Sequence, residues 1–177
     1  MAPAGDQNPR YMSAYDDFDA QGNTKKIDYG MDGYILLDVQ AQELGSEVLR
    51  IATNMKEFAS GAQIKGITKT ISVPGKHGRT DSLNLRLGLL LIDNVAFVGF
   101  PGELVTSVGL ALKDSFKSLN CEHTVVVTQC NGSNGYFSDD NGYKNQTFDG
   151  AASSAKPGYD KQVINAEKDM LKALTVN

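Results

Sequence analysis

Tryptophan is absent from this 177-residue chain, and cysteine and histidine occur only twice each. Two cysteines cannot form the disulfide framework of a small secreted domain. Cys121 and Cys130 flank one apolar run at an odd separation, which predicts free thiols on opposite faces of a strand. The two histidines lie far apart in the sequence, and we interpret His77 as a solvated loop residue and His123 as a structural residue.

The chain also lacks a basic cluster and a long apolar run. Its 17 basic and 21 acidic residues give a net charge of −4, and their spread excludes a nucleic-acid-binding footprint. The longest apolar stretch, residues 87–100, is interrupted by Asp93 and Asn94 and is too short to span a bilayer. The first residues have no charged region followed by an apolar one, so we expect neither a signal peptide nor a transmembrane helix in this chain.

What remains is an ordinary globular composition, with 41% hydrophobic and 21% charged residues. The length suits a single domain spanning residues 1–177. Residues 1–26 are rich in Gly, Asp, Asn, Gln and Pro and predict an irregular loop. Because such an opening is unusual for an independent domain, we expect this chain to be the C-terminal part of a larger one.

Hydrophobic periodicity predicts the regular elements. Helical spacing indicates helices over residues 32–54, 104–119 and 160–174, the first of them with one buried face. Alternation and β-branched runs indicate strands over residues 64–73, 83–92, 95–100 and 123–128, with a tight turn at residues 93–94. Residues 131–158 show no periodicity and predict a long structureless loop, either functional or disordered. The order loop-α-β-β-β-α-β-long loop-α is typical of an α/β fold, in which helices pack on a mixed sheet.

Glu103 is the first candidate for chemistry. It follows a buried strand through Pro101 and Gly102, at the predicted start of a helix. The carboxylate could cap that helix, or it could serve as a metal ligand or general base. Both interpretations stay open at the level of sequence.

Tyr136 and the first polar loop are the other candidates. Tyr136 ends a Gly- and Asn-rich segment directly after the strand at 123–128, where α/β folds place their sites. If the strands ending near Phe100 and Cys130 are neighbours, Tyr136 and Glu103 emerge at one edge of the sheet. Alternatively, Tyr136 packs back on the core. Residues 5–10 combine Asp, Gln, Asn and Arg with Gly and Pro in a polar turn.

Taken in order, these motifs resemble the last part of the catalytic domain of the neutral/alkaline non-lysosomal ceramidase family. The resemblance extends from Gly5 to the final helix and rests on residues 5–10, 85–88, 97–103, 131–136 and 148–150. The resemblance implies a zinc amidase that cleaves the N-acyl bond of ceramide. It also implies a secreted, periplasmic or membrane-associated parent protein with peripheral membrane contact.

The resemblance also implies a ligand set. In that family, two histidines from earlier in the chain, a glutamate and a tyrosine hold the zinc. The glutamate falls on Glu103 and the tyrosine on Tyr136, whereas neither His77 nor His123 matches a family ligand. Carboxylate and phenolate oxygens complement two imidazoles and leave a position open for water.

Two positions depart from the family pattern. Asn8 stands where the family has a serine nucleophile, and Phe148 stands where a tyrosine polarises the scissile carbonyl. An amide can orient a substrate but cannot act as that nucleophile. We therefore expect water activated by zinc to attack, with Asp6, Asn8 and Arg10 positioning a lipid-like amide substrate.

Three functional hypotheses follow. The first is an incomplete zinc amidohydrolase, inactive alone and completed by the N-terminal part of the same catalytic domain. The second is a non-catalytic relative that binds a lipid or glycan, which the losses at Asn8 and Phe148 favour. The third is a small domain with an unrelated role, which would unfold cooperatively by itself.

Overall fold

The computed structural model describes residues 2–7, 15–27, 30–58, 60–76 and 81–175. They form two compact units. The first comprises Met1–Gln7 and Gly61–Asn177, and the second comprises Asn8–Ser60. The single domain expected over residues 1–177 stays a prediction.

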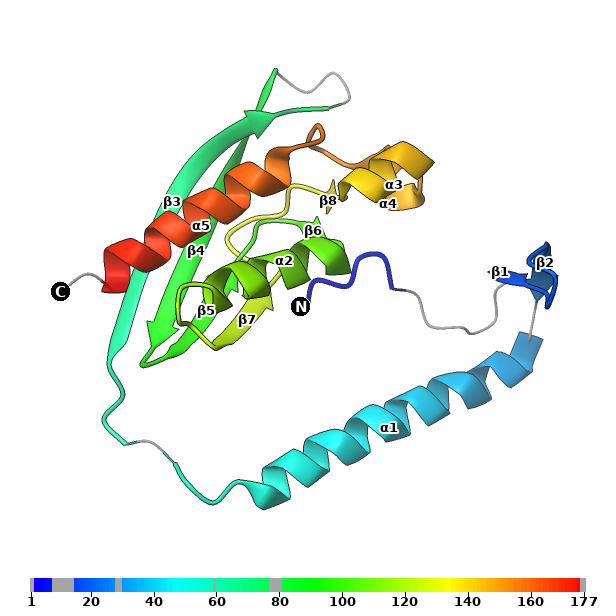
Figure 1. The fold of residues 1–177 in the computed structure, drawn as a ribbon, viewed down its shortest axis with the longest axis horizontal. Helices are drawn as coiled ribbons and strands as arrows, with labels where there is room; N and C mark the ends of the chain where they lie inside the picture. The colour runs from blue at the N-terminus through cyan, green and yellow to red at the C-terminus, as the bar shows by residue number, and fades with distance from the viewer. Residues whose placement is uncertain (1, 8–14, 28–29, 59, 77–80, 176–177) are drawn as a thin grey trace. The chain divides into compact units, whose positions relative to one another are not determined.

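A four-stranded mixed sheet is the centre of the first unit (Figure 1). Its strands are β3 (Ile64–Pro74), β4 (Ser82–Ile92), β5 (Val95–Gly99) and β7 (His123–Val127), in the order β3-β4-β5-β7. The first three strands pair antiparallel, and β7 pairs parallel with β5. All four predicted strands and the α/β class are thereby confirmed. Asp93 adopts a positive φ of 52° in the predicted tight turn between β4 and β5.

Alternation along β4 shows how the sheet separates its two faces. Leu85, Leu87, Leu89 and Leu91 are buried, whereas their neighbours Asn84, Arg86 and Leu90 are exposed. The buried face is covered by α2 (Thr106–Lys117) and α5 (Tyr159–Thr175), with α5 over β3 and β4 and α2 beside β7 (Figure 1). Burial of these leucines against two helices provides the main hydrophobic stabilisation of the unit.

The helix predicted over residues 104–119 begins two residues later than expected. Glu103 and Leu104 instead form the short strand β6 (Glu103–Leu104), which pairs with β8 (Tyr136–Phe137). The interpretation of Glu103 as the cap of this helix is therefore wrong. The strand conformation is stabilised because Leu104 and Phe137 are both fully buried in the core.

The segment predicted as a structureless loop over residues 131–158 is ordered, so that prediction is wrong. It contains β8, α3 (Asp140–Asn145) and α4 (Phe148–Ala152). Asp139 and Thr147 cap the two short helices through their side chains. A Cβ at Gly150 would collide with the backbone carbonyl of Gly142, so two glycines permit the close packing of α3 and α4.

The second unit holds β1 (Tyr15–Phe18), β2 (Thr24–Ile27), the 3-10 turn η1 (Gly30–Asp32) and α1 (Gly33–Asn54). The antiparallel pair β1-β2 corrects the prediction of an irregular loop over residues 1–26. The α1 bounds agree with the prediction to within one residue. The predicted buried face of this helix is wrong, because every residue from 38 to 54 is exposed. None of the helices in the described part of the chain is long and apolar enough to cross a membrane.

Candidate functional site

The site begins at the carboxyl ends of the two parallel strands, β5 and β7. Gly99 and Val127 are register partners there, and both chains leave the sheet at the same edge. The backbone N–H of Cys130 donates to the carbonyl of Phe100 at 2.9 Å, and that of Asn134 donates to the carbonyl of Pro101 at 2.8 Å. These bonds hold the two outgoing segments side by side. The prediction that these two strands are neighbours in the sheet is therefore confirmed.

The outgoing segments then pair again as β6 and β8. Glu103 and Tyr136 are direct register partners in this parallel pair, and so are Leu104 and Phe137. Successive side chains of a strand point to opposite faces. Because Leu104 and Phe137 point into the core, Glu103 and Tyr136 share the opposite face, where both are half-buried. Neighbouring strands lie about 4.8 Å apart, so the two side chains leave adjacent backbone positions.

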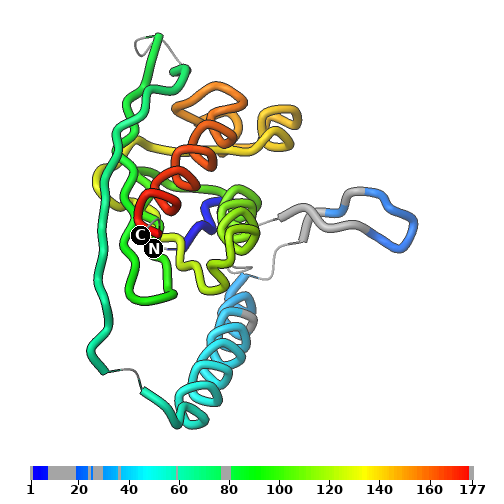
Figure 2. Tube along the Cα trace, turned by 60° about the vertical axis from the view of Figure 1, so that its left-hand side comes forward, coloured from blue at the N-terminus to red at the C-terminus, as the bar shows by residue number. Residues whose placement is uncertain are grey.

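A segment from the start of the chain lines the other side of Glu103. The N–H of Gly5 donates to the carbonyl of Leu104 at 3.1 Å, which places residues 2–7 alongside β6. In Figure 2 this segment is the short dark-blue stretch beside the green helix α2. A Cβ at residue 5 would lie 3.1 Å from Glu103 Cγ and 3.4 Å from Glu103 Oε1. Glycine at this position therefore leaves room for the Glu103 carboxylate.

Asp6 is fastened to the start of α2. Its Oδ1 accepts a bond from the N–H of Thr106 and another from the Thr106 hydroxyl, both at 2.7 Å. Partial burial by itself would raise the pKa of the Asp6 carboxyl. Its hydrogen bonds, chiefly these two, together have a larger and opposite effect, so the net pKa lies below the ordinary value. Asp6 therefore caps α2 from a distant part of the sequence. Its expected contact with substrate stays a prediction.

Phe148 and Asp149 begin α4, and Phe148 contacts Tyr136. The Phe148 ring meets the Tyr136 ring edge-on, with centroids 5.2 Å apart and planes at 80°. Asp149 is buried, and its pKa is raised by that burial and by the negative charge of Asp6. Asp149 and Gly5 were not predicted as site residues from the sequence. Their motifs, Phe-Asp-Gly and Gly-Asp, were the only available signal.

Other predicted site residues lie elsewhere. Asn8, Arg10 and His77 are outside the described residues. His123 begins β7, whereas Tyr136 follows the end of that strand. A five-residue strand separates its ends by roughly 13 Å, so His123 lies at the opposite edge of the sheet.

The donor atoms at this edge of the sheet match zinc only in part. Glu103 and Tyr136 supply two hard oxygen donors from adjacent strands, which suits zinc chemically. Among the described residues, no group of three or more His, Cys, Asp or Glu side chains is placed to hold a metal ion. The pair by itself therefore supplies two oxygen donors, fewer than the three or four protein ligands of a zinc site.

A separate cavity of about 580 Å³ lies on the sheet face opposite the helices. Glycines from three neighbouring strands contribute to its lining, and Leu90, Phe97 and Val127 add apolar surface. The full glycine set is Gly66, Gly88 and Gly99. A Cβ at Gly88 would lie only 2.5 Å from Asn131 Nδ2, so this glycine accommodates the loop that follows β7. A cavity of this size and lining is typical of small-molecule sites.

Comparisons with known proteins return structures from the family that the sequence motifs resemble. No family model matches the chain, and no curated protein matches it. One matching structure is a ceramidase complexed with C2, at 19% identity and a TM-score of 0.47 over 51% of this chain. Another is neutral ceramidase from Pseudomonas aeruginosa, at 19% identity and a TM-score of 0.48 over 53% of this chain.

The chain is similar to ceramidase structures. It covers only 15% and 16% of the lengths of those two chains. Those two proteins are therefore several times longer than this chain, and the ceramidase activity in their names is a statement about them.

Proposed function

We propose that this chain is part of a zinc-dependent amidohydrolase of the ceramidase type, which cleaves the N-acyl amide bond of a ceramide-like lipid. The register pairing of Glu103 with Tyr136 carries the proposal. The two residues are 33 positions apart in the sequence, and each lies in a short motif of its own. They share one face at the edge of the sheet where α/β folds place their sites.

Each residue has a distinct role in the proposed site. Glu103 and Tyr136 hold the zinc through oxygen, and two histidines outside this chain complete the ligand set. When bound, zinc polarises a carbonyl oxygen and makes a water molecule more acidic. Gly5 leaves space for the Glu103 carboxylate, and Asp6 fixes the segment that leads to Asn8 and Arg10. Asn8 and Arg10 orient the substrate amide by hydrogen bonding.

The chain alone is proposed to be inactive towards amides. Zinc sites use three or four protein ligands, and this chain supplies two of the proposed four. Water, rather than a side chain, is the proposed nucleophile, because Asn8 stands where a serine would be needed.

A second function is non-catalytic lipid binding. The apolar cavity on the open sheet face favours it, as does the absence of a hydroxyl at Asn8 and Phe148. Under this alternative, an aliphatic probe such as a fluorescent fatty acid binds the chain, and Glu103→Gln leaves its affinity unchanged.

The decisive experiment measures zinc binding to the 177-residue chain by equilibrium dialysis and elemental mass spectrometry, with and without added imidazole. Free imidazole substitutes for the two missing histidine ligands. We expect weak zinc binding that imidazole strengthens, and we expect Glu103→Gln and Tyr136→Phe each to weaken it at least tenfold, since even secondary ligand partners contribute 10–100-fold.

Glu122→Gln is the matched control, because it removes the same charge from an exposed residue. It should leave zinc binding unchanged. Equal zinc binding by wild type, Glu103→Gln and Tyr136→Phe would contradict the proposal that Glu103 and Tyr136 are zinc ligands.

A further inference from the structure

Three asparagine–glycine pairs follow β7, at residues 131–132, 134–135 and 141–142. An asparagine that precedes glycine is chemically labile, because glycine has no side chain to hinder attack of its backbone nitrogen on the asparagine amide. By sequence the three pairs are alike, but the structure gives each of them different surroundings. Those surroundings decide which pair can react.

The pair at Asn141 and Gly142 lies in α3 and is held at both reacting groups. The N–H of Gly142, which carries the attacking nitrogen, donates to Asp139 Oδ1 at 2.7 Å. Oδ1 of Asn141 accepts a hydrogen bond from Asn145 Nδ2 at 2.8 Å. Reaction at this pair would first have to break a hydrogen bond to a carboxylate and open the first turn of the helix.

The pair at Asn134 and Gly135 is fixed by the segment that leads into β6. The N–H of Asn134 donates to the carbonyl of Pro101, and the carbonyl of Gly135 accepts from the N–H of Glu103, both at 2.8 Å. Both residues of the pair are half-buried. Ring closure here would have to turn a backbone that these two hydrogen bonds hold in place.

The pair at Asn131 and Gly132 has neither restraint. Both residues and the following Ser133 are exposed. Within the part of the chain that the structure describes, no group accepts a hydrogen bond from the N–H of Gly132. Gly132 has a φ of 150°, a conformation that residues with a Cβ rarely adopt. The attacking nitrogen of this pair is therefore accessible, and its backbone is unhindered.

We propose that Asn131 is a site of spontaneous deamidation. The backbone nitrogen of Gly132 attacks Cγ of Asn131 and closes a five-membered succinimide ring. The side-chain nitrogen leaves together with the proton of the Gly132 amide, as ammonia. Water then opens the ring at either carbonyl carbon, which gives aspartate or isoaspartate. The net change is the uptake of one water and the loss of one ammonia, so the reaction needs no other reactant.

Deamidation changes the charge of the cavity on the open face of the sheet, because Asn131 lines it. Nδ2 of Asn131 lies against the backbone of two register partners, 2.5 Å from a Cβ built at Gly88 and 3.3 Å from one built at Gly99. None of the described residues that line this cavity is an acidic or basic one. An aspartate at position 131 therefore introduces a negative charge into a lining that is otherwise uncharged.

Isoaspartate has a second effect, because it lengthens the main chain by one methylene group. The N–H groups of Cys130 and Asn134 donate to carbonyls of the segment after β5, at 2.9 and 2.8 Å. These two bonds fix the chain on either side of residues 131–133. The added carbon must be accommodated between them or displace the segment that leads to Tyr136. Neither effect depends on zinc or on the proposed hydrolase.

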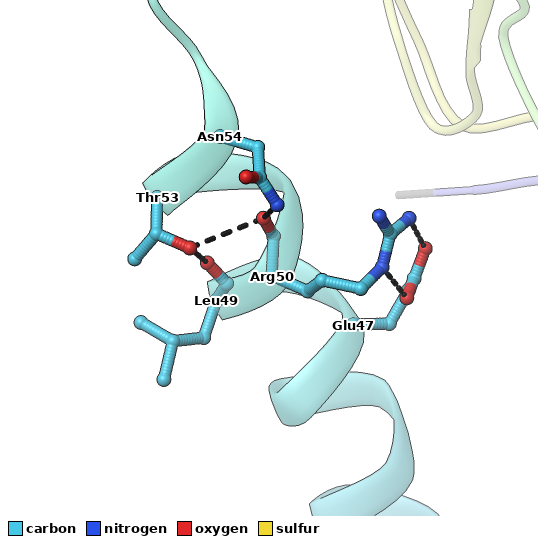
Figure 3. Close-up of polar contacts among 5 residues, drawn as sticks. All are labelled: Glu47, Leu49, Arg50, Thr53 and Asn54. Atoms are coloured by element: carbon cyan, nitrogen blue, oxygen red, sulfur yellow. Dashed lines mark hydrogen bonds and ion pairs between the residues drawn. The ribbon is translucent and has the colours of Figure 1, made fainter.

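The first test follows deamidation of the purified chain during incubation at mildly alkaline pH. Peptide mapping by mass spectrometry locates each modified asparagine, and ion exchange separates the more acidic product. We expect Asn131 to react faster than Asn134 and Asn141 by about tenfold or more, because the other two must first break hydrogen bonds. Asn54 is an internal reference without a following glycine, and its Nδ2 donates to the carbonyl of Arg50 at 2.8 Å (Figure 3).

The second test separates the contribution of structure from that of sequence. In concentrated urea the three pairs should react at similar rates, because the hydrogen bonds that protect two of them are lost. In the folded chain Asn131→Gln should abolish the fast ammonia release, since a glutamine closes a larger ring more slowly. Asn134→Gln is the matched control and should leave that release unchanged. Circular dichroism checks that both variants fold like the wild type.

Two results would overturn the proposal. One is a folded chain in which Asn131 stays intact while all three pairs react in urea. The other is a folded chain in which Asn134 or Asn141 reacts as fast as Asn131.

Discussion

Glu167 is fully buried on α5, and neither of its carboxylate oxygens has a hydrogen-bond partner among the residues that the structure describes. Removing a carboxylate from water strongly disfavours its charged form. Burial accordingly raises the pKa of Glu167 to about 8, so the side chain is mostly protonated in the folded protein at neutral pH. The same residue has a pKa near 4.5 in the unfolded chain.

This difference predicts that stability falls as pH rises. Above pH 4.5 the unfolded chain releases the Glu167 proton while the folded protein retains it, so the unfolded state is favoured. The free energy of unfolding should fall by up to about 1.4 kcal/mol per pH unit between pH 4.5 and 8, and then level off. Urea denaturation at several pH values measures this slope.

The variant Glu167→Gln removes the titrating proton and keeps the side-chain shape. We expect it to flatten the pH dependence and to be the more stable protein at pH 9 by a few kcal/mol. Glu122→Gln, at an exposed position, serves as control and should keep the wild-type slope. A wild-type slope in Glu167→Gln would contradict the assignment.

At the scale of the element, α2 depends on a residue that its own sequence does not contain. Val105, the residue before the helix, has no side chain that can cap it. Instead, Oδ1 of Asp6 accepts a hydrogen bond from the backbone N–H of Thr106. We expect Asp6→Ala to lower the free energy of unfolding by about 1 kcal/mol at pH 7, as for other lost helix caps. Thermal unfolding of the two proteins measures the difference.

Protonation gives an independent check on this cap. The pKa of Asp6 is lowered in the folded protein, so its contribution is complete above pH 3.8 and is lost as pH falls through the folded pKa. The stability difference between wild type and Asp6→Ala should therefore shrink in acid. Asp6→Asn, which retains an acceptor oxygen, should lose less at pH 7. Equal stability of all three proteins would argue against the cap.

At the scale of the whole molecule, the two units differ in how much they bury. The first has a core formed by the sheet, α2 and α5, whereas α1 in the second is exposed from residue 38 to 54. Regions with few buried apolar contacts open at low free energy. We therefore expect α1 to lose its helical structure before the first unit unfolds.

Two probes separate these events in a Cys130→Ser variant. Circular dichroism follows total helix content, and the reactivity of the buried Cys121 thiol reports opening of the first unit. Part of the helical signal should disappear at lower denaturant than that at which Cys121 becomes reactive. Coincident transitions would mean that the chain unfolds as one cooperative structure.

Local patterns in the sequence determined much of this fold. The alternation of leucines predicted β4, the turn at residues 93–94 predicted its pairing with β5, and the apolar stripe of residues 160–174 predicted α5. In each case neighbouring residues face a common core, so the burial pattern repeats with the period of the element. The short helices α3 and α4 escaped prediction because capping side chains and close-packed glycines define them, and these leave no periodic pattern.

Only the tertiary structure decided the geometry of the candidate site. The sequence named Glu103 and Tyr136 and placed both after strands, but their register depends on the burial of Leu104 and Phe137 beneath them. Likewise, the cap that Asp6 provides to α2 joins residues 100 positions apart. Such contacts arise from packing between distant segments, and no local pattern of residues encodes which distant backbone groups will meet.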